Sequence, residues 1–100
     1  MTIDELRQRI DQLDEKLVEL LNERAHCALE IGKLKKTLGL EVYQPEREAE
    51  VLHHVRSHGR ETESPLEGDA IVRVFERIID EARRIERATA HKPAGNGEDR

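Results

Sequence analysis

The apolar residues of the first 38 positions follow one helical pattern, and this pattern constrains the fold more than any other feature of the sequence. Inward-facing positions recur in alternating steps of three and four residues, the spacing of one face of an α-helix. They are Ile3, Leu6, Ile10, Leu13, Leu17, Leu20, Cys27, Ile31, Leu34 and Leu38. Thr2 and Glu5 have the spacing of a capping box, and Gly39 is typical of a position just after a helix. We therefore predict a helix from Ile3 to about Leu38.

A helix of this length would extend about 50 Å. The whole chain has 100 residues, enough for one small domain. The remaining residues are too few to cover so long a rod, so we expect a partner chain.

Two shorter helices are predicted after a connector. Pro45 suits the first turn of a second helix that ends near Gly59. Ser64 and Glu67 repeat the capping-box spacing, with Pro65 at the first helical position, and predict a third helix to about Ala90. The fold class is then all-α, with one long, one short and one medium helix in a domain over 1–90. Residues 91–100 carry no apolar pattern and are predicted to form a disordered tail.

Charge, apolar run length and the cysteine and histidine positions argue against several classes of function. The net charge is −5 and the basic residues are interspersed with acids, so we expect no nucleic-acid binding. No apolar run has the length of a membrane span, which predicts a soluble, cytoplasmic protein without a membrane partner. Cys27 lies within the apolar pattern and is expected to be a buried, reduced thiol. His54 and His58 have no evident third ligand, so we expect no metal site.

Charged residues occupy positions that the pattern assigns to the core. Arg24 stands where the long helix should carry an apolar residue, and Lys35 lies about 20° from it on the helical wheel. Ala28, between them, leaves space on that face. Glu86 shares the apolar face of the third helix, and Arg47 and Glu48 belong to the first turn of the second.

Two interpretations of these charges remain open. Arg24 could fix the register of a coiled coil or form a salt bridge between chains. Alternatively, the cations surround an anionic ligand with more than one carboxylate or phosphate, because buried cations need a counter-charge. Arg7 lies about 25 Å from Arg24 along the rod. It reaches the same ligand only if two first helices pair antiparallel near Leu17 or Val18, which places Arg7 of one chain opposite Ala28 of the other.

These residues resemble a known family. The stretch LRQRIDQLDEKLVELLNERAHCALEIGKLK, followed by VYQPERE, is similar to the all-helical (AroQ-type) chorismate mutases. The resemblance covers about Ile3 to Ala90. It implies an intertwined helical homodimer with two equivalent sites and the conversion of chorismate to prephenate, in phenylalanine and tyrosine biosynthesis, without cofactor or metal.

The resemblance also implies roles for individual residues. Arg7 from the partner chain and Arg24 would hold substrate carboxylates. Lys35 would contact the ether oxygen and a carboxylate. Arg47 would support this cationic cage, and Glu48 would bind the substrate hydroxyl. These residue types suit the chemistry, because negative charge builds on the ether oxygen in the transition state.

The remaining three positions carry reservations. Gln44 stands where many members have Asp, and Ala82 stands where some have a Ser that helps to bind a carboxylate. Glu86 falls where the family has Gln or Glu, donating to the ether oxygen, and a carboxyl group must be protonated to donate. Activity is therefore expected to fall as the pH rises above neutral. We take Lys35, Glu86 and Arg24 as the catalytic residues.

Two alternatives to chorismate mutase activity are retained. Isochorismate–pyruvate lyase shares the fold and a similar cationic pocket. A non-catalytic dimerisation or regulatory module of the same fold would be expected to lose one or more of the cage cations, and all four are present in this sequence.

Overall fold

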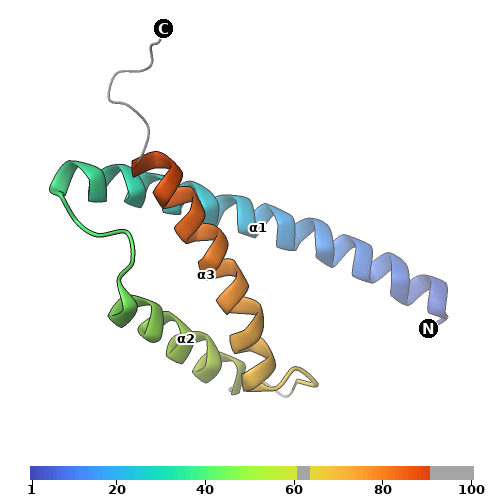
Figure 1. Cartoon of the computed structure of the whole chain (residues 1–100). Coiled ribbons are helices and arrows are strands. Elements are labelled where there is room, and N and C mark those ends of the chain that lie inside the picture. The colour runs from blue at the N-terminus through green and yellow to red at the C-terminus, as the bar shows by residue number, and fades with distance from the viewer. Residues whose placement is uncertain (61–63, 91–100) are drawn as a thin grey trace, which may run out of the picture.

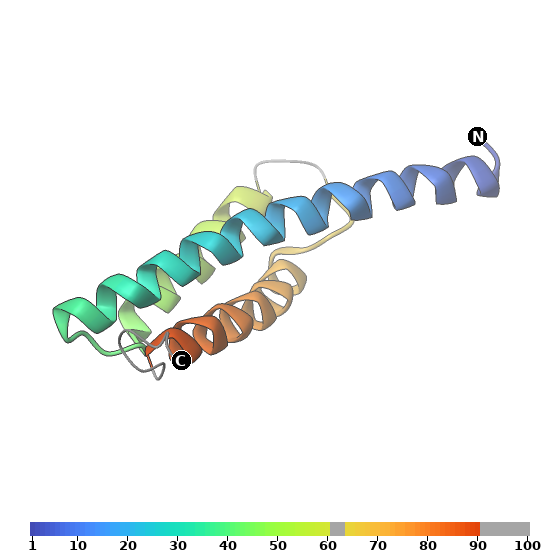
Figure 2. The same cartoon turned by 90° about the horizontal axis from the view of Figure 1, so that it is seen from above.

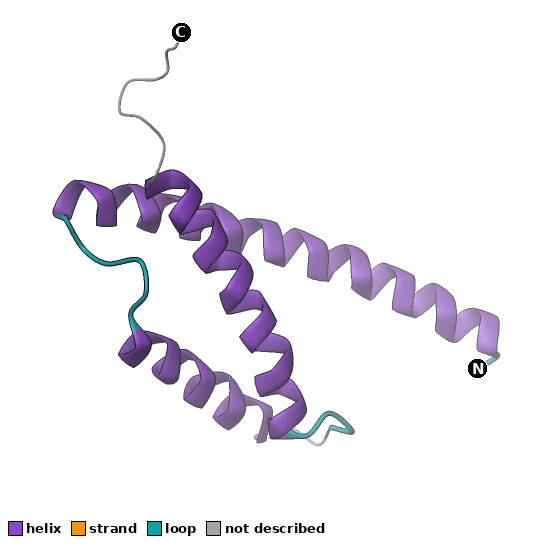
Figure 3. Ribbon diagram, in the orientation of Figure 1, coloured by secondary structure: helices purple, strands orange, loops and turns teal. Residues whose placement is uncertain are grey.

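The chain forms three α-helices in a computed structural model that describes residues 1–60 and 64–90. They are α1 (Ile3–Leu38), α2 (Pro45–Arg60) and α3 (Gly68–Ala90). Figure 3 shows that helices and connecting loops account for all of the described chain. The predicted all-α fold with one long, one short and one medium helix is confirmed. The predicted disordered tail at 91–100 lies outside the described residues.

The ends of α1 are those expected from the sequence. The Thr2 hydroxyl accepts a hydrogen bond from the Glu5 backbone at 3.1 Å, and the Glu5 carboxylate accepts one from the Thr2 backbone at 2.9 Å. This reciprocal pair is a complete capping box. At the other end Gly39 has a φ of 71°, which the absence of a β-carbon permits, and Leu40 N donates to Lys35 O.

The predicted start of the third helix was wrong by one turn. The Ser64 hydroxyl accepts from the backbone of Leu66, two residues on, at 3.0 Å. This contact closes a local turn in place of the predicted helix cap. The helix begins at Gly68, and its first turn is closed by the Ile71 N–H donating to the Glu67 carbonyl.

The third helix holds the other two together. α3 packs against both α1 and α2, whereas within the described residues α1 and α2 do not pack on each other. Figure 1 shows the resulting open frame, with the end of α3 over the second half of α1 and its start beside the end of α2. The core is correspondingly small, and Ala28 and Ile79 are its buried apolar residues.

The first half of α1 lies beyond the other helices, as the view from above shows (Figure 2). Its apolar positions Leu6, Ile10, Leu13 and Leu17 are between 41% and 56% exposed. A single chain therefore leaves a long apolar stripe without cover. Within the described residues, no helix is both long enough and apolar enough to cross a membrane.

Candidate active site

A cavity of about 480 Å³ lies where the second half of α1, the connector, the start of α2 and the end of α3 meet. Its wall includes seven of the eight residues singled out from the sequence, namely Arg24, Lys35, Gln44, Arg47, Glu48, Ala82 and Glu86. The eighth, Arg7, lies exposed in the first half of α1 and does not line the cavity. Cys27 was expected to be buried, but it is exposed and lines this cavity, because its face of α1 borders open space at that level.

Lys35 connects α1 to α3 and to the connector between α1 and α2. Its ammonium group donates to the Glu86 carboxylate at 2.6 Å and to the Val42 carbonyl at 2.8 Å. The side chains of Lys35 and Glu86 are only 12% and 13% exposed. A partly buried ion pair with this geometry fixes both groups against the cavity wall.

Gly32 allows α1 and α3 to approach closely beside this ion pair. A β-carbon at position 32 would lie 3.0 Å from the Glu86 Cα and 3.3 Å from the Thr89 Cβ. Gly32 is buried and lies one turn before Lys35. The absence of a side chain at Gly32 therefore sets the distance at which Lys35 meets Glu86.

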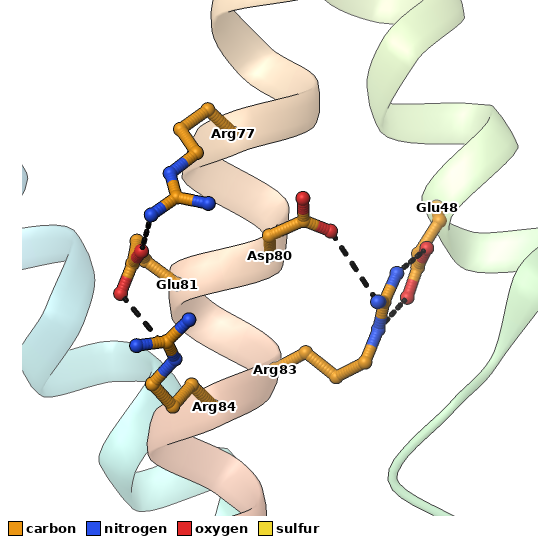
Figure 4. A network of polar contacts seen from close by, with 6 residues as sticks. All are labelled: Glu48, Arg77, Asp80, Glu81, Arg83 and Arg84. Carbon is orange, nitrogen blue, oxygen red and sulfur yellow. Dashed lines mark hydrogen bonds and ion pairs between the residues drawn. The ribbon is translucent and has the colours of Figure 1, made fainter.

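Arg83 is a cavity residue that the sequence analysis missed. Its guanidinium forms a two-pronged pair with Glu48, with Nη2–Oε1 at 2.6 Å and Nε–Oε2 at 3.1 Å (Figure 4). The hydrogen bond to Glu48 raises the pKa of the Arg83 guanidinium above its ordinary value, so the group stays charged. The signal was present, because Arg83 follows the buried Ile79 by four residues and borders the same helix face.

Arg24 and Arg47 are the other two cations of the wall. Within residues 1–60 and 64–90, Arg24 forms no ion pair with a carboxylate. Arg47 contacts Glu50 at 3.4 Å, but both side chains are about two-thirds exposed, so this contact holds it weakly. Both side chains can therefore turn to a ligand at little cost.

Gln44 and Ala82 line the cavity without adding charge. The Gln44 carbonyl accepts from the Glu48 backbone at 3.1 Å and so marks the start of α2. Ala82 lines the cavity from α3, next to Arg83. Its methyl group provides no polar contact.

The cavity carries a surplus of positive charge. Arg24, Lys35, Arg47 and Arg83 stand against Glu48 and Glu86, which leaves two positive charges when all six are ionised. A ligand with two carboxylates would neutralise this surplus. Within the described residues, no group of three or more side chains is arranged to hold a metal ion.

The fold and this cavity define an all-helical protein whose cavity carries surplus positive charge. The sequence profile of the family described as chorismate mutase type II matches residues 6–87. The chain therefore belongs to the chorismate mutase type II family.

Relatives and a solved structure agree with this assignment. The chain is 44% identical over 79 residues to a bifunctional chorismate mutase/prephenate dehydratase of Pseudomonas aeruginosa, which covers 74% of this chain and 21% of that protein. A chorismate mutase of Methanocaldococcus jannaschii is 25% identical over 83% of this chain and 82% of its own length. The structure of chorismate mutase (form II) from Thermus thermophilus has a TM-score of 0.79 and 32% identity, and covers 85% of this chain and 93% of that one. The chain spans about a fifth of the length of the bifunctional relatives.

Proposed function

We propose that this chain is a chorismate mutase that converts chorismate to prephenate. The observation that carries the proposal is the cavity, whose two surplus positive charges match the two carboxylates of chorismate. Membership of the family supports the same substrate. Isochorismate–pyruvate lyase activity and a non-catalytic role gain no support from the names of the relatives.

The reaction is a rearrangement within one molecule. The C–O bond of the enolpyruvyl ether breaks as the new C–C bond forms, and negative charge accumulates on the ether oxygen. Donors already in place at that oxygen stabilise the transition state more than the ground state. The Lys35 ammonium, which lies 2.6 Å from the Glu86 carboxylate at the cavity wall, is the donor in the charge state described above. Glu86 adds a second donor only in molecules in which it carries a proton.

The arginines hold the reacting conformation. Arg24 on α1 and Arg47 on α2 face the cavity from two sides, and each can form a bidentate contact with a carboxylate. Fixing both carboxylates selects the folded conformer in which the reacting carbons meet. Glu48, at the start of α2, accepts a hydrogen bond from the substrate hydroxyl.

A second copy of the chain completes the site. The uncovered apolar stripe on the first half of α1 supports a homodimer in which two such helices pack against each other. If they run antiparallel and cross near Leu17, Arg7 of one protomer lies opposite Ala28 of the other. Ala28 borders the cavity, so Arg7 would enter it from the partner and bind a substrate carboxylate.

The test is an assay of the purified chain with chorismate, following loss of chorismate and formation of prephenate, with isochorismate as the comparison substrate. Arg24→Ala should reduce turnover at least a thousandfold while light scattering still reports a dimer, because it removes a charged contact to the substrate. Full activity in this variant would contradict the proposal. Turnover of isochorismate alone would replace it with the lyase activity.

A further inference from the structure

Arg83 connects α2 and α3 through side chains at the cavity. Its two short contacts with Glu48 join the helices through side chains that are 22% and 25% exposed. Another ion pair between these helices, Arg56 with Asp69, involves residues that do not line the cavity. Of these two ion pairs, Arg83–Glu48 is the one that lines the cavity.

Each nitrogen of the Arg83 guanidinium contacts a carboxylate of the protein. Nε and Nη2 bind Glu48, and Nη1 lies 3.3 Å from the Asp80 carboxylate (Figure 4). Its central carbon also lies 5.2 Å from the centre of the Tyr43 ring, a cation–π contact with the connector. A guanidinium held in this way is oriented towards Glu48 and away from direct binding of the substrate.

The position of the Glu48 carboxylate depends on its contact with Arg83. Because α2 does not pack on α1 within the described residues, the position of α2 relative to Arg24 and Lys35 rests on α3 and the connector. Of these two, α3 reaches the Glu48 carboxylate itself, through Arg83. Loss of this contact would release the Glu48 carboxylate.

We propose that Arg83 is a positioning residue, which fixes the Glu48 carboxylate so that it can accept the hydrogen bond of the substrate hydroxyl. This inference rests on the proposed function. Arg83 acts through Glu48 and does not itself touch the substrate.

The first experiment compares Arg83→Gln with Arg84→Gln in the full chain. Arg84→Gln removes the same charge from the next residue, but Arg84 is 71% exposed and lies 3.8 Å from Glu81. We expect Arg83→Gln to lower kcat/KM about 10- to 100-fold, the size of effect that a misplaced binding group produces. Arg84→Gln should keep the activity. Arg83→Lys, which restores the charge but not the two-pronged geometry, should fall between Arg83→Gln and the unsubstituted chain.

The second experiment separates positioning from direct binding. Arg83→Gln is measured again in a Glu48→Gln background. If Arg83 acts through Glu48, Arg83→Gln should lower kcat/KM by less than about threefold in the Glu48→Gln background. The reason is that both substitutions then remove the same interaction with the substrate. The same fold-loss in both backgrounds would overturn the proposal. A lower melting temperature with unchanged kcat/KM in Arg83→Gln would also overturn it, since the pair would then be only structural.

A third measurement does not depend on activity. The Nε–H signal of Arg83 in the ligand-free chain, assigned by nuclear magnetic resonance, should shift in Glu48→Gln and stay in place in Glu50→Gln, whose partner is Arg47. A signal unchanged in Glu48→Gln would show that the pair does not form and would refute the positioning role. An unsubstituted chain that leaves chorismate intact would refute the proposed function instead, and the resonance test would still decide whether Arg83 holds Glu48.

Discussion

Gly32 and Glu86 meet where α1 and α3 pack closely, beside the cavity. A β-carbon on Gly32 would lie 3.0 Å from the Cα of Glu86, on the backbone of α3 and not on a side chain that could turn away. The ion pair between Lys35 and Glu86 thus rests on a contact between two backbones.

Gly32→Ala should therefore lower kcat while the chain stays folded. The added methyl group forces α3 away by a few tenths of an ångström and moves Glu86 relative to Lys35. We expect a 10- to 100-fold loss of kcat, in line with small displacements of catalytic groups. The better helix propensity of alanine, about 1 kcal/mol, should offset part of the strain in thermal unfolding. Gly59→Ala is the control, because its β-carbon would meet only the flexible end of Ile71, away from the cavity. Equal activity in both variants would exclude a role for the close approach.

Glu86→Gln and Glu86→Ala together test whether Glu86 donates to the ether oxygen. A carboxyl group donates only when it carries a proton, whereas an amide of the same length donates without one. We expect Glu86→Gln to keep kcat/KM within about tenfold of the unsubstituted chain, and Glu86→Ala to lower it by about a hundredfold or more, the cost of removing one donor to a developing oxyanion. Glu81→Ala, on the same helix but outside the cavity, is the control. Equal losses in Glu86→Gln and Glu86→Ala would argue against Glu86 as a donor.

Mixed dimers test the contribution of Arg7. Arg7→Ala and Arg24→Ala should each be almost inactive, because each removes a cation from both sites of the dimer. When the two are unfolded, mixed in equal amounts and refolded, half of the dimers are hybrids with one intact site, so about a quarter of the full activity should return. No recovery, with hybrids demonstrated by mass, would mean that Arg7 does not act across the dimer.

Glu5→Gln tests the capping box of α1. The hydrogen bond from the Thr2 backbone lowers the pKa of Glu5 below its ordinary value of 4.5. A carboxylate with a depressed pKa in the folded state stabilises the fold above its unfolded-state pKa, and this contribution disappears as the pH falls through the folded-state pKa. The free energy of unfolding of Glu5→Gln should thus be lower than that of the unsubstituted chain at neutral pH, and the two should converge as the pH falls through the lowered folded-state pKa of Glu5. Glu19→Gln, in the middle of α1 and away from the capping box, serves as the comparison and should leave the free energy of unfolding at neutral pH unchanged.

Much of the fold followed from signals close together in the sequence. The bounds of α1 were predictable because Thr2 and Glu5 satisfy one end and Gly39 the other, within a turn of each helix end. Periodicity alone placed Arg24 and Lys35 on one face, and both line the cavity. Ser64 was misleading because a hydroxyl before a helix can cap it or close a local turn, and the local sequence does not distinguish the two.

Contacts between helices were harder to predict. Arg83 and Glu48 are far apart in the sequence, and their pairing depends on how α2 and α3 cross. The close approach at Gly32 likewise depends on where α3 lies, and the sequence pattern of α1 does not predict this position. Cys27 was predicted to be buried because the apolar pattern does not distinguish a packed face from the wall of a cavity.

The absence of packing between α1 and α2 within the described residues has a thermodynamic consequence for ligand binding. A dicarboxylate that contacts Arg24 on one helix and Arg47 on the other would be the first direct link between them. Its affinity and the order of the first turn of α2 are then coupled, and the coupling is reciprocal. A second molecule that binds outside the cavity and stabilises α2 next to α1 should therefore increase the affinity for the substrate. A molecule that moves α2 away from α1 should lower that affinity.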